Sequence, residues 1–354
     1  MPRVELELRP QPLAVMRWAA PLLALALTLL VSAPLLLALG LNPLTTCRIF
    51  LLEPLSTANG VSEWLLKASP LILIAVGLAI GFRANVWNIG AEGMFTMGAI
   101  AAAWLGLHVG SAGKGWLLPL MLLVGALAGA AWAAIPAFLK THANTSEILV
   151  SLMLNYVAAL ILAYLVNGPL QDPDGMNYPQ SAPLDPAAMF APLFDGLRVN
   201  ASLGITLLVV AVATLFTSRG FVAFQMQVSG DAPAAARYAG FGARRVVWVS
   251  LLVSGATAGL AGTLEAAGPL GQLSPSLSPG YGFAAIIVAF VGRLSPAGCV
   301  LGGLLLSLLY LGGEAVQLSL NVPATLARAF QGLLLFFLLA ADVLIVYRVR
   351  LRRG

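Results

Sequence analysis

Long apolar runs with almost no charged residues occupy most of this chain, and they limit the folds available to it. Hydrophobic residues make up 60% of the sequence and charged residues only 9%. The hydrocarbon core of a bilayer is about 30 Å thick and is crossed by a helix of roughly 20 apolar residues. No segment between the runs is long enough to build a water-facing core. The sequence therefore predicts an all-α polytopic membrane protein with residues 1–354 forming one membrane domain.

We expect about ten transmembrane helices, with boundaries good to a few residues. They lie at 18–41, 68–82, 86–107, 116–139, 147–167, 201–217, 246–265, 281–292, 298–319 and 324–346. The first run follows three arginines, as in a signal peptide, but it is too long for a cleaved apolar core of about 7–15 residues. We therefore expect an uncleaved first helix.

The basic residues indicate how the chain is oriented. Most of the 19 lysines and arginines fall on the side of the membrane that holds residues 1–17, if ten helices are assumed. Basic residues are enriched in cytoplasmic connections, so both termini should be cytoplasmic. The same distribution explains the net charge of +5 without a nucleic-acid partner, and leaves membrane lipid as the surrounding medium.

Two of the expected helices are short and interrupted. The span 68–82 contains Pro70, and the span 281–292 is bracketed by glycines. Short spans of this kind in matching halves of a transporter point to a binding region near the middle of the membrane. Helices two to five start outside and helices seven to ten start inside, so an inverted repeat relating these two groups is predicted.

Two connections on the expected outer side are long. Residues 42–67 include the amphipathic stretch SEWLLKAS, which we expect to lie along the membrane surface as a short helix. Residues 168–200 contain six prolines, a composition typical of an extended surface. This external loop could dock a partner or serve as a passive connector.

The longest connection on the expected cytoplasmic side is 218–245. Asp231 is suited to cap a short helix that has Pro233 in its first turn and ends at Gly240. Small residues would let another protein approach this helix closely, and Arg237 and Tyr238 are residue types enriched at interfaces. The alternative is a simple amphipathic connector.

Five motifs, in order along the chain, resemble one family. They are WNIGAEG (87–93), SEILVSLMLNY (146–156), GDAPAAARYAG (230–240), SGATAGLAGTLEAAG (254–268) and SPGYGFAAIIVAFVGRLSPAG (278–298). Together they resemble the inner-membrane permease subunits of bacterial ABC importers, in the branched-chain amino acid and ribose permease superfamily. Within it they are most similar to the nucleoside and simple-sugar branch. The similarity extends from about residue 60 to 346.

The resemblance implies partners that this chain does not contain. They are a second permease subunit, giving a heterodimer, a cytoplasmic ATP-binding subunit and an external substrate-binding lipoprotein at a bacterial inner membrane. The loop that matches 230–240 is the coupling helix of the family, and it meets the ATPase. Its candidate residues here are Gly230, Asp231, Ala235, Ala236, Arg237, Tyr238 and Gly240. No phosphate-binding G-x-x-x-x-G-K-[ST] motif occurs, so ATP and Mg²⁺ are expected on the partner ATPase and no cofactor on this chain.

Polar residues within the apolar runs are candidates for the substrate path. Ionisable groups at membrane depth are costly, and they usually face a polar pathway or a partner. The candidates are Asn88, Glu92, Asn155, Glu265 and Glu314. Asn88 and Glu92, four residues apart on one expected helical face, could instead satisfy a broken backbone turn. Asn155 could join helices, and Glu265 and Glu314 could lie at an outer rim.

The expected function is translocation of a nucleoside or simple sugar by alternating access, without chemical change. No HExxH or G-x-S-x-G motif is present, so no catalytic residue is assigned. Cys47 and Cys299 are far apart and lack ligand-like neighbours, which favours packing roles over a metal site. The competing hypothesis is a secondary transporter driven by an ion gradient, with Glu92 as the coupling carboxylate.

Overall fold

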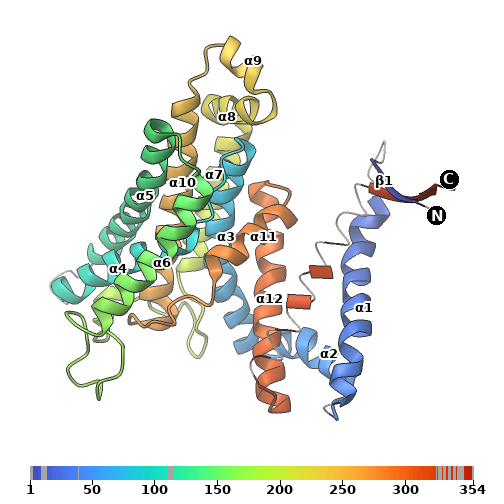
Figure 1. Cartoon of the computed structure of the whole chain (residues 1–354). Coiled ribbons are helices and arrows are strands. Elements are labelled where there is room, and N and C mark those ends of the chain that lie inside the picture. The colour runs from blue at the N-terminus through green and yellow to red at the C-terminus, as the bar shows by residue number, and fades with distance from the viewer. Residues whose placement is uncertain are drawn as a thin grey trace. The chain divides into compact units, whose positions relative to one another are not determined.

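The computed structural model of the chain is mostly helical (Figure 1). It describes residues 3–8, 14–38, 40–110, 115–323 and 347–352, together with isolated positions between 325 and 340. Its helices are α1 (Ala14–Ala38), α2 (Pro43–Leu52), α3 (Ala58–Arg83), α4 (Ala91–Val109), α5 (Leu117–Ala143), α6 (Glu147–Val166), α7 (Ser202–Arg219), α8 (Phe221–Asp231), α9 (Pro233–Tyr238), α10 (Ala243–Glu265), α11 (Tyr281–Val291) and α12 (Pro296–Leu320). Short 3-10 turns occur at Glu53–Leu55 and Pro186–Ala188, and a π-helical turn, Ala266–Leu270, extends α10.

The chain divides into two compact units. The first comprises Met1–Val61 and Leu308–Gly354, and the second Ser62–Ser307. Within the first unit, strand β1 (Arg3–Leu8) pairs antiparallel with β2 (Tyr347–Arg352). The sequence reading as an all-helical chain did not anticipate this pair. It brings residues 3–8 and 347–352 side by side.

The second unit is built around glycines in three helices. A Cβ added at Gly98 of α4 would collide with Gly259 of α10. Gly129 of α5 lies equally close to Gly255 of α10, and Gly259 also approaches Gly125. Without a hydrophobic driving force in lipid, helices associate where small residues let their backbones pack closely. The spacing of these glycines therefore joins α4, α5 and α10 into a rigid core.

Six helices in the described part of the chain are long and apolar enough to cross a membrane, namely α3, α5, α6, α7, α10 and α12. A seventh span is possible if the pair Ala26–Ala38 and Pro43–Leu55, bent by 120°, counts as one. This agrees with a polytopic all-α membrane protein. The number ten stays a prediction, since most of the expected span 324–346 lies outside the described residues.

The expected short second span and the surface helix before it were wrong. The stretch SEWLLKAS forms part of α3, which continues for 26 residues through Pro70. Trp64 in this stretch donates a hydrogen bond from Nε1 to the carbonyl oxygen of Leu304, 2.7 Å away. Packing against α12 therefore helps to hold the amphipathic stretch as part of one long helix.

The expected helix 86–107 was also wrong at its beginning. Asn85 has a left-handed backbone (φ 56°) just after α3, and the chain then runs without regular structure to Gly90, which caps α4. Asn88 consequently precedes the helix that contains Glu92. The two side chains do not share a helical face.

The connection 218–245, expected on the cytoplasmic side, holds two helices where one was expected. α8 runs to Asp231, and Ala232, not Asp231, occupies the capping position of α9 without a side-chain hydrogen bond. The predicted capping role of Asp231 was therefore wrong, because this residue is the last residue of α8. Gly240 follows α9 with a left-handed backbone (φ 76°), as a helix stop requires.

Candidate translocation and docking sites

The irregular segment 84–90 is held by polar side chains of neighbouring helices. Asn88 is only 2% exposed. Its Nδ2 donates to the Ser254 hydroxyl of α10 at 2.7 Å, and its Oδ1 accepts from the N–H of Gly90 at 2.9 Å. Helix-breaking backbone at membrane depth is tolerated where such partners satisfy it.

α6 supplies the second set of contacts. The Ser151 hydroxyl accepts from the N–H of Ile89 at 3.2 Å. The amide of Asn155 donates to the carbonyl oxygen of Ile89 at 2.9 Å and accepts from the N–H of Gly93 at 2.8 Å. One asparagine thus bridges the irregular segment and the first turn of α4.

Glu92 lies where two helices begin. Its carboxylate accepts from the N–H of Gly282 in the first turn of α11 at 2.6 Å, and it also hydrogen-bonds the side chain of Ser278. A Cβ added at Gly282 would collide with the backbone nitrogen of Glu92, so the two helix starts are in direct contact. The N-terminus of a helix carries partial positive charge, which a carboxylate stabilises.

The structure thus brings together Asn88, Glu92 and Asn155 and separates Glu265 from them. Glu265 is buried at the end of α10, within electrostatic reach of Lys67, Glu63 and Arg198. Glu314 is an exposed residue of α12 in the other unit. The role of these five residues in lining a substrate path stays a prediction.

Almost all residues of the helix α9 are exposed. Tyr238 is 97% exposed, and Ala235 and Arg237 are exposed as well. Ala236, at 3% exposure, is the residue of α9 that faces inward. Phe241, just beyond the helix, packs edge-on against Phe221 and Phe224 of α8. These contacts fix a small-residue helix to α8 and leave its outer face free.

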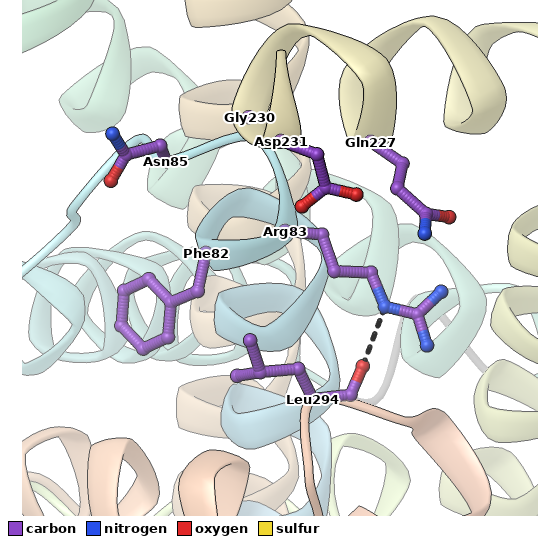
Figure 2. A pocket seen from close by; sticks show the side chains of 7 residues that line it. All are labelled: Phe82, Arg83, Asn85, Gln227, Gly230, Asp231 and Leu294. Atoms are coloured by element: carbon purple, nitrogen blue, oxygen red, sulfur yellow. Dashed lines mark hydrogen bonds between the residues drawn. The ribbon is translucent and has the colours of Figure 1, made fainter. Parts of the chain in front are cut away.

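A cavity of about 380 Å³ lies beside this loop (Figure 2). Its lining includes the end of α3 (Phe82, Arg83 and Asn85), the end of α8 (Gln227, Gly230 and Asp231) and Leu294. The Nε of Arg83 donates to the carbonyl oxygen of Leu294 at 2.8 Å. Sequence reasoning missed this site, because its residues come from three distant segments.

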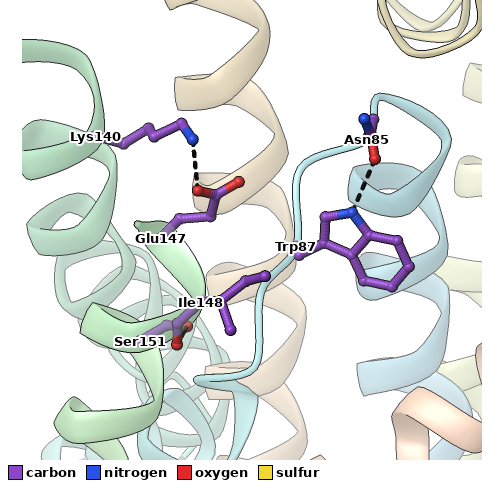
Figure 3. Close-up of polar contacts among 6 residues, drawn as sticks. All are labelled: Asn85, Trp87, Lys140, Glu147, Ile148 and Ser151. Carbon is purple, nitrogen blue, oxygen red and sulfur yellow. Dashed lines mark hydrogen bonds and ion pairs between the residues drawn. The ribbon is translucent and has the colours of Figure 1, made fainter. Parts of the chain in front are cut away.

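Two further polar contacts near the same end of the bundle were not foreseen (Figure 3). Lys140 of α5 forms an ion pair of 2.6 Å with the buried carboxylate of Glu147 at the start of α6. Asn85 accepts a hydrogen bond from Nε1 of Trp87 at 2.8 Å. No group of three or more potential metal ligands occurs among the described residues.

The comparisons with known proteins decide the family. The family described as branched-chain amino acid transport system / permease component matches residues 60–339. The chain belongs to this family. This span contains the irregular segment 84–90, the helix α9 and the start of α11.

Several curated relatives cover much of the chain. It is 36% identical to the glucose ABC transporter permease protein TsgB13 of Haloferax volcanii, over 99% of this chain and 96% of the relative. It is 28% identical to the nucleoside ABC transporter permease protein NupB of Lactococcus lactis, over 90% and 89% of the two chains. It is 29% identical to the guanosine ABC transporter permease protein NupP of Bacillus subtilis, over 78% and 80%. No solved structure matches.

This chain is therefore a permease subunit of an ABC transporter, and not an enzyme. ATP hydrolysis belongs to a separate subunit in such transporters. The comparisons favour this function over a secondary transporter that uses Glu92 to couple an ion gradient.

Proposed function

We propose that the chain forms part of an ATP-driven importer for a neutral hydroxylated ring compound, either a simple sugar or a nucleoside. The relative of 36% identity is named for glucose, and two others are named for nucleosides. The structural observation that carries the proposal is α9, a helix of small exposed residues fixed by Ala236 and Phe241. A permease that moves solute with another subunit's ATP needs such a docking element.

The partners are a second permease subunit forming a heterodimer, a cytoplasmic ATP-binding subunit and an external substrate-binding lipoprotein. ATP and Mg²⁺ are bound by the ATPase, and this chain holds no cofactor. The docking loop, which we define as residues 230–240, meets the ATPase on the cytoplasmic side. The membrane is the bacterial inner membrane, with both termini of the chain in the cytoplasm.

Transport proceeds by alternating access. Closure of the ATPase subunits displaces the docking loop, and rigid helices rock around a central path. The path is lined or supported by Asn88, Glu92, Asn155, Glu265 and Glu314, whose amide and carboxylate groups suit hydroxylated rings. Dispersed contacts of this kind release what the binding protein delivers.

The proposal is tested with the complete transporter in proteoliposomes. Labelled glucose and labelled guanosine are offered with their binding protein, with ATP inside or without it. ATP-dependent uptake of one of them is expected. Uptake that follows an imposed ion gradient and ignores ATP would contradict the proposal.

Replacing Ala235 with Trp examines the docking loop itself. Ala235 is exposed on α9, so the variant should fold and insert normally, yet a bulky ring on the docking face should abolish uptake. The matched control is Ala201→Trp, at an exposed alanine just before α7. Co-purification of the ATPase and uptake are measured for both variants. Normal uptake by Ala235→Trp would refute the assignment of α9.

A further inference from the structure

We propose that Arg83 is a positioning residue that joins the docking loop to α4 and α11, the two helices whose first turns meet at Glu92. The proposal rests on the proposed function, because it concerns how movement of the docking loop reaches the membrane path. Arg83 is the last residue of α3, and it contacts the loop through its backbone and the end of α11 through its side chain.

The backbone contact is with Gly230, next to last in α8. A Cβ added at Gly230 would collide with the carbonyl oxygen of Arg83 and press on the backbone of Ala84. The absence of a side chain therefore lets α8 rest directly on the end of α3. Closely packed backbones transmit displacement because they do not deform continuously.

The side-chain contact reaches the turn between α11 and α12. Arg293 and Leu294 both have left-handed backbones there (φ 52° and 53°), which is costly for residues other than glycine. Arg83 Nε donates to the carbonyl oxygen of Leu294 at 2.8 Å. A charge-assisted hydrogen bond thus stabilises a strained turn at the end of α11.

The chain itself provides the second connection. Directly after Arg83, residues 84–90 lead to α4, whose Glu92 holds the N–H of Gly282 at the start of α11. The short helix α11 is therefore held at both of its ends. The Arg83 side chain bonds the turn after its last residue, and Glu92 of α4, which follows Arg83 in the chain, bonds its first turn. A shift of the docking loop can reach α4 and α11 together through this one residue.

The cavity next to Arg83 leaves room for such a shift. In Figure 2 the side chains of Gln227 and Asp231 extend from α8 toward the arginine. Of the guanidinium nitrogens of Arg83, only Nε has a hydrogen-bond partner among the described residues. The terminal nitrogens remain available to these two side chains when the loop moves inward.

The test compares Arg83→Lys and Gly230→Ala with two controls in the complete transporter. Lysine keeps the positive charge at the helix end but lacks the Nε donor, and alanine at Gly230 separates the two backbones. The controls are Arg48→Lys, at an exposed arginine of α2, and Gly204→Ala of α7, where an added Cβ meets nothing within 4 Å. The readouts are the ATPase retained on purification and the solute imported per ATP hydrolysed.

Arg83→Lys should retain the ATPase and continue to hydrolyse ATP, while import per ATP falls at least about tenfold, as expected when a charged group loses a hydrogen bond. Import per ATP should fall for Gly230→Ala as well, because its methyl group separates the two backbones. The controls should match the unaltered chain. Unchanged import per ATP in both variants would overturn the role of Arg83. Loss of the ATPase from Arg83→Lys would also overturn it, since the residue would then act on docking or folding. If the unaltered transporter shows no ATP-dependent import, the proposed function fails first and this proposal falls with it.

Discussion

The regions that precede α4 and α11 have the same order of elements but different supports. In the first, α3 is followed by the irregular segment 84–90 and then by α4. In the second, α10 and its π-helical turn are followed by the irregular segment 271–280 and then by α11. This order is compatible with the predicted inverted repeat, which stays a prediction. The two segments differ in what holds them.

The first segment is held by other helices. Its hydrogen bonds go to Ser254 of α10 and to Ser151 and Asn155 of α6. At its beginning it touches Gly230 of the docking loop. Its position therefore depends on the helix bundle and on the expected cytoplasmic side.

The second segment is held by the proline-rich loop 168–200. Ser181 and Leu273 exchange two hydrogen bonds of 2.9 Å, one from each backbone N–H. The N–H of Leu184 donates to the carbonyl oxygen of Gly271 at 2.8 Å. The loop is thus integrated into the second half, whereas docking of an external partner on it stays a prediction. The difference teaches that the two irregular segments are attached to different parts of the permease, the first to α6, α10 and the docking loop and the second to the proline-rich loop 168–200.

Gly282→Ala changes the contact between the starts of α4 and α11, where the two regions meet, and the largest effect is expected there. Its methyl group would collide with the backbone nitrogen of Glu92, which cannot move as a flexible side chain would. Overpacking of this kind costs about 3 kcal/mol. We expect a lower melting temperature in detergent and loss of uptake. Gly204→Ala, on an open helix face, is the matched control, and equal stability of the two variants would show that the helix starts are not tightly joined.

Much of the helical architecture could be predicted from the sequence, because apolar length is a local property. The expected spans 147–167 and 298–319 differ by at most two residues at each end from α6 and α12. The segment 84–90 could not be predicted in this way. Its letters are mostly apolar and include no proline, and its backbone is satisfied by Ser151 and Asn155, more than 60 residues away in sequence.

At the candidate site too, some features could be predicted from the sequence and others could not. Asn88, Glu92 and Asn155 were chosen as candidates by residue type, since polar groups in an apolar run need partners. Ser254, the partner of Asn88, lies 166 residues away from it in the sequence, and Gly282, the partner of Glu92, lies 190 residues away. A single sequence carries no measure of such proximity, and the contacts of Arg83 were missed for the same reason.

Asn88→Ala tests the support of the first segment. The change leaves the N–H of Gly90 without its acceptor and removes the hydrogen bond to Ser254, in a buried site. Unsatisfied buried groups cost about 2 kcal/mol. The stability of Asn88→Ala should fall less than that of Gly282→Ala. Ser254→Ala should lose less stability again, because the hydrogen bond between Asn88 and the N–H of Gly90 remains. Thermal unfolding of the three purified variants measures this order, and Ser254→Ala as damaging as Asn88→Ala would contradict it.

Ser181→Ala tests the support of the second segment, and the smallest effect is expected there. The N–H of Leu273 loses the Ser181 hydroxyl as acceptor, while the backbone bond from Ser181 to Leu273 remains. One neutral hydrogen bond contributes about 1 kcal/mol, so the fold should persist. If the second segment responds to the external side, uptake should fall with docking of the ATPase unchanged. The variant Ser274→Ala should behave as the unaltered chain, because within the described part of the chain its hydroxyl bonds only that of Ser276. Weakened ATPase binding in Ser181→Ala, measured by co-purification, would show that the two segments are not separately attached and that the contrast between them is wrong.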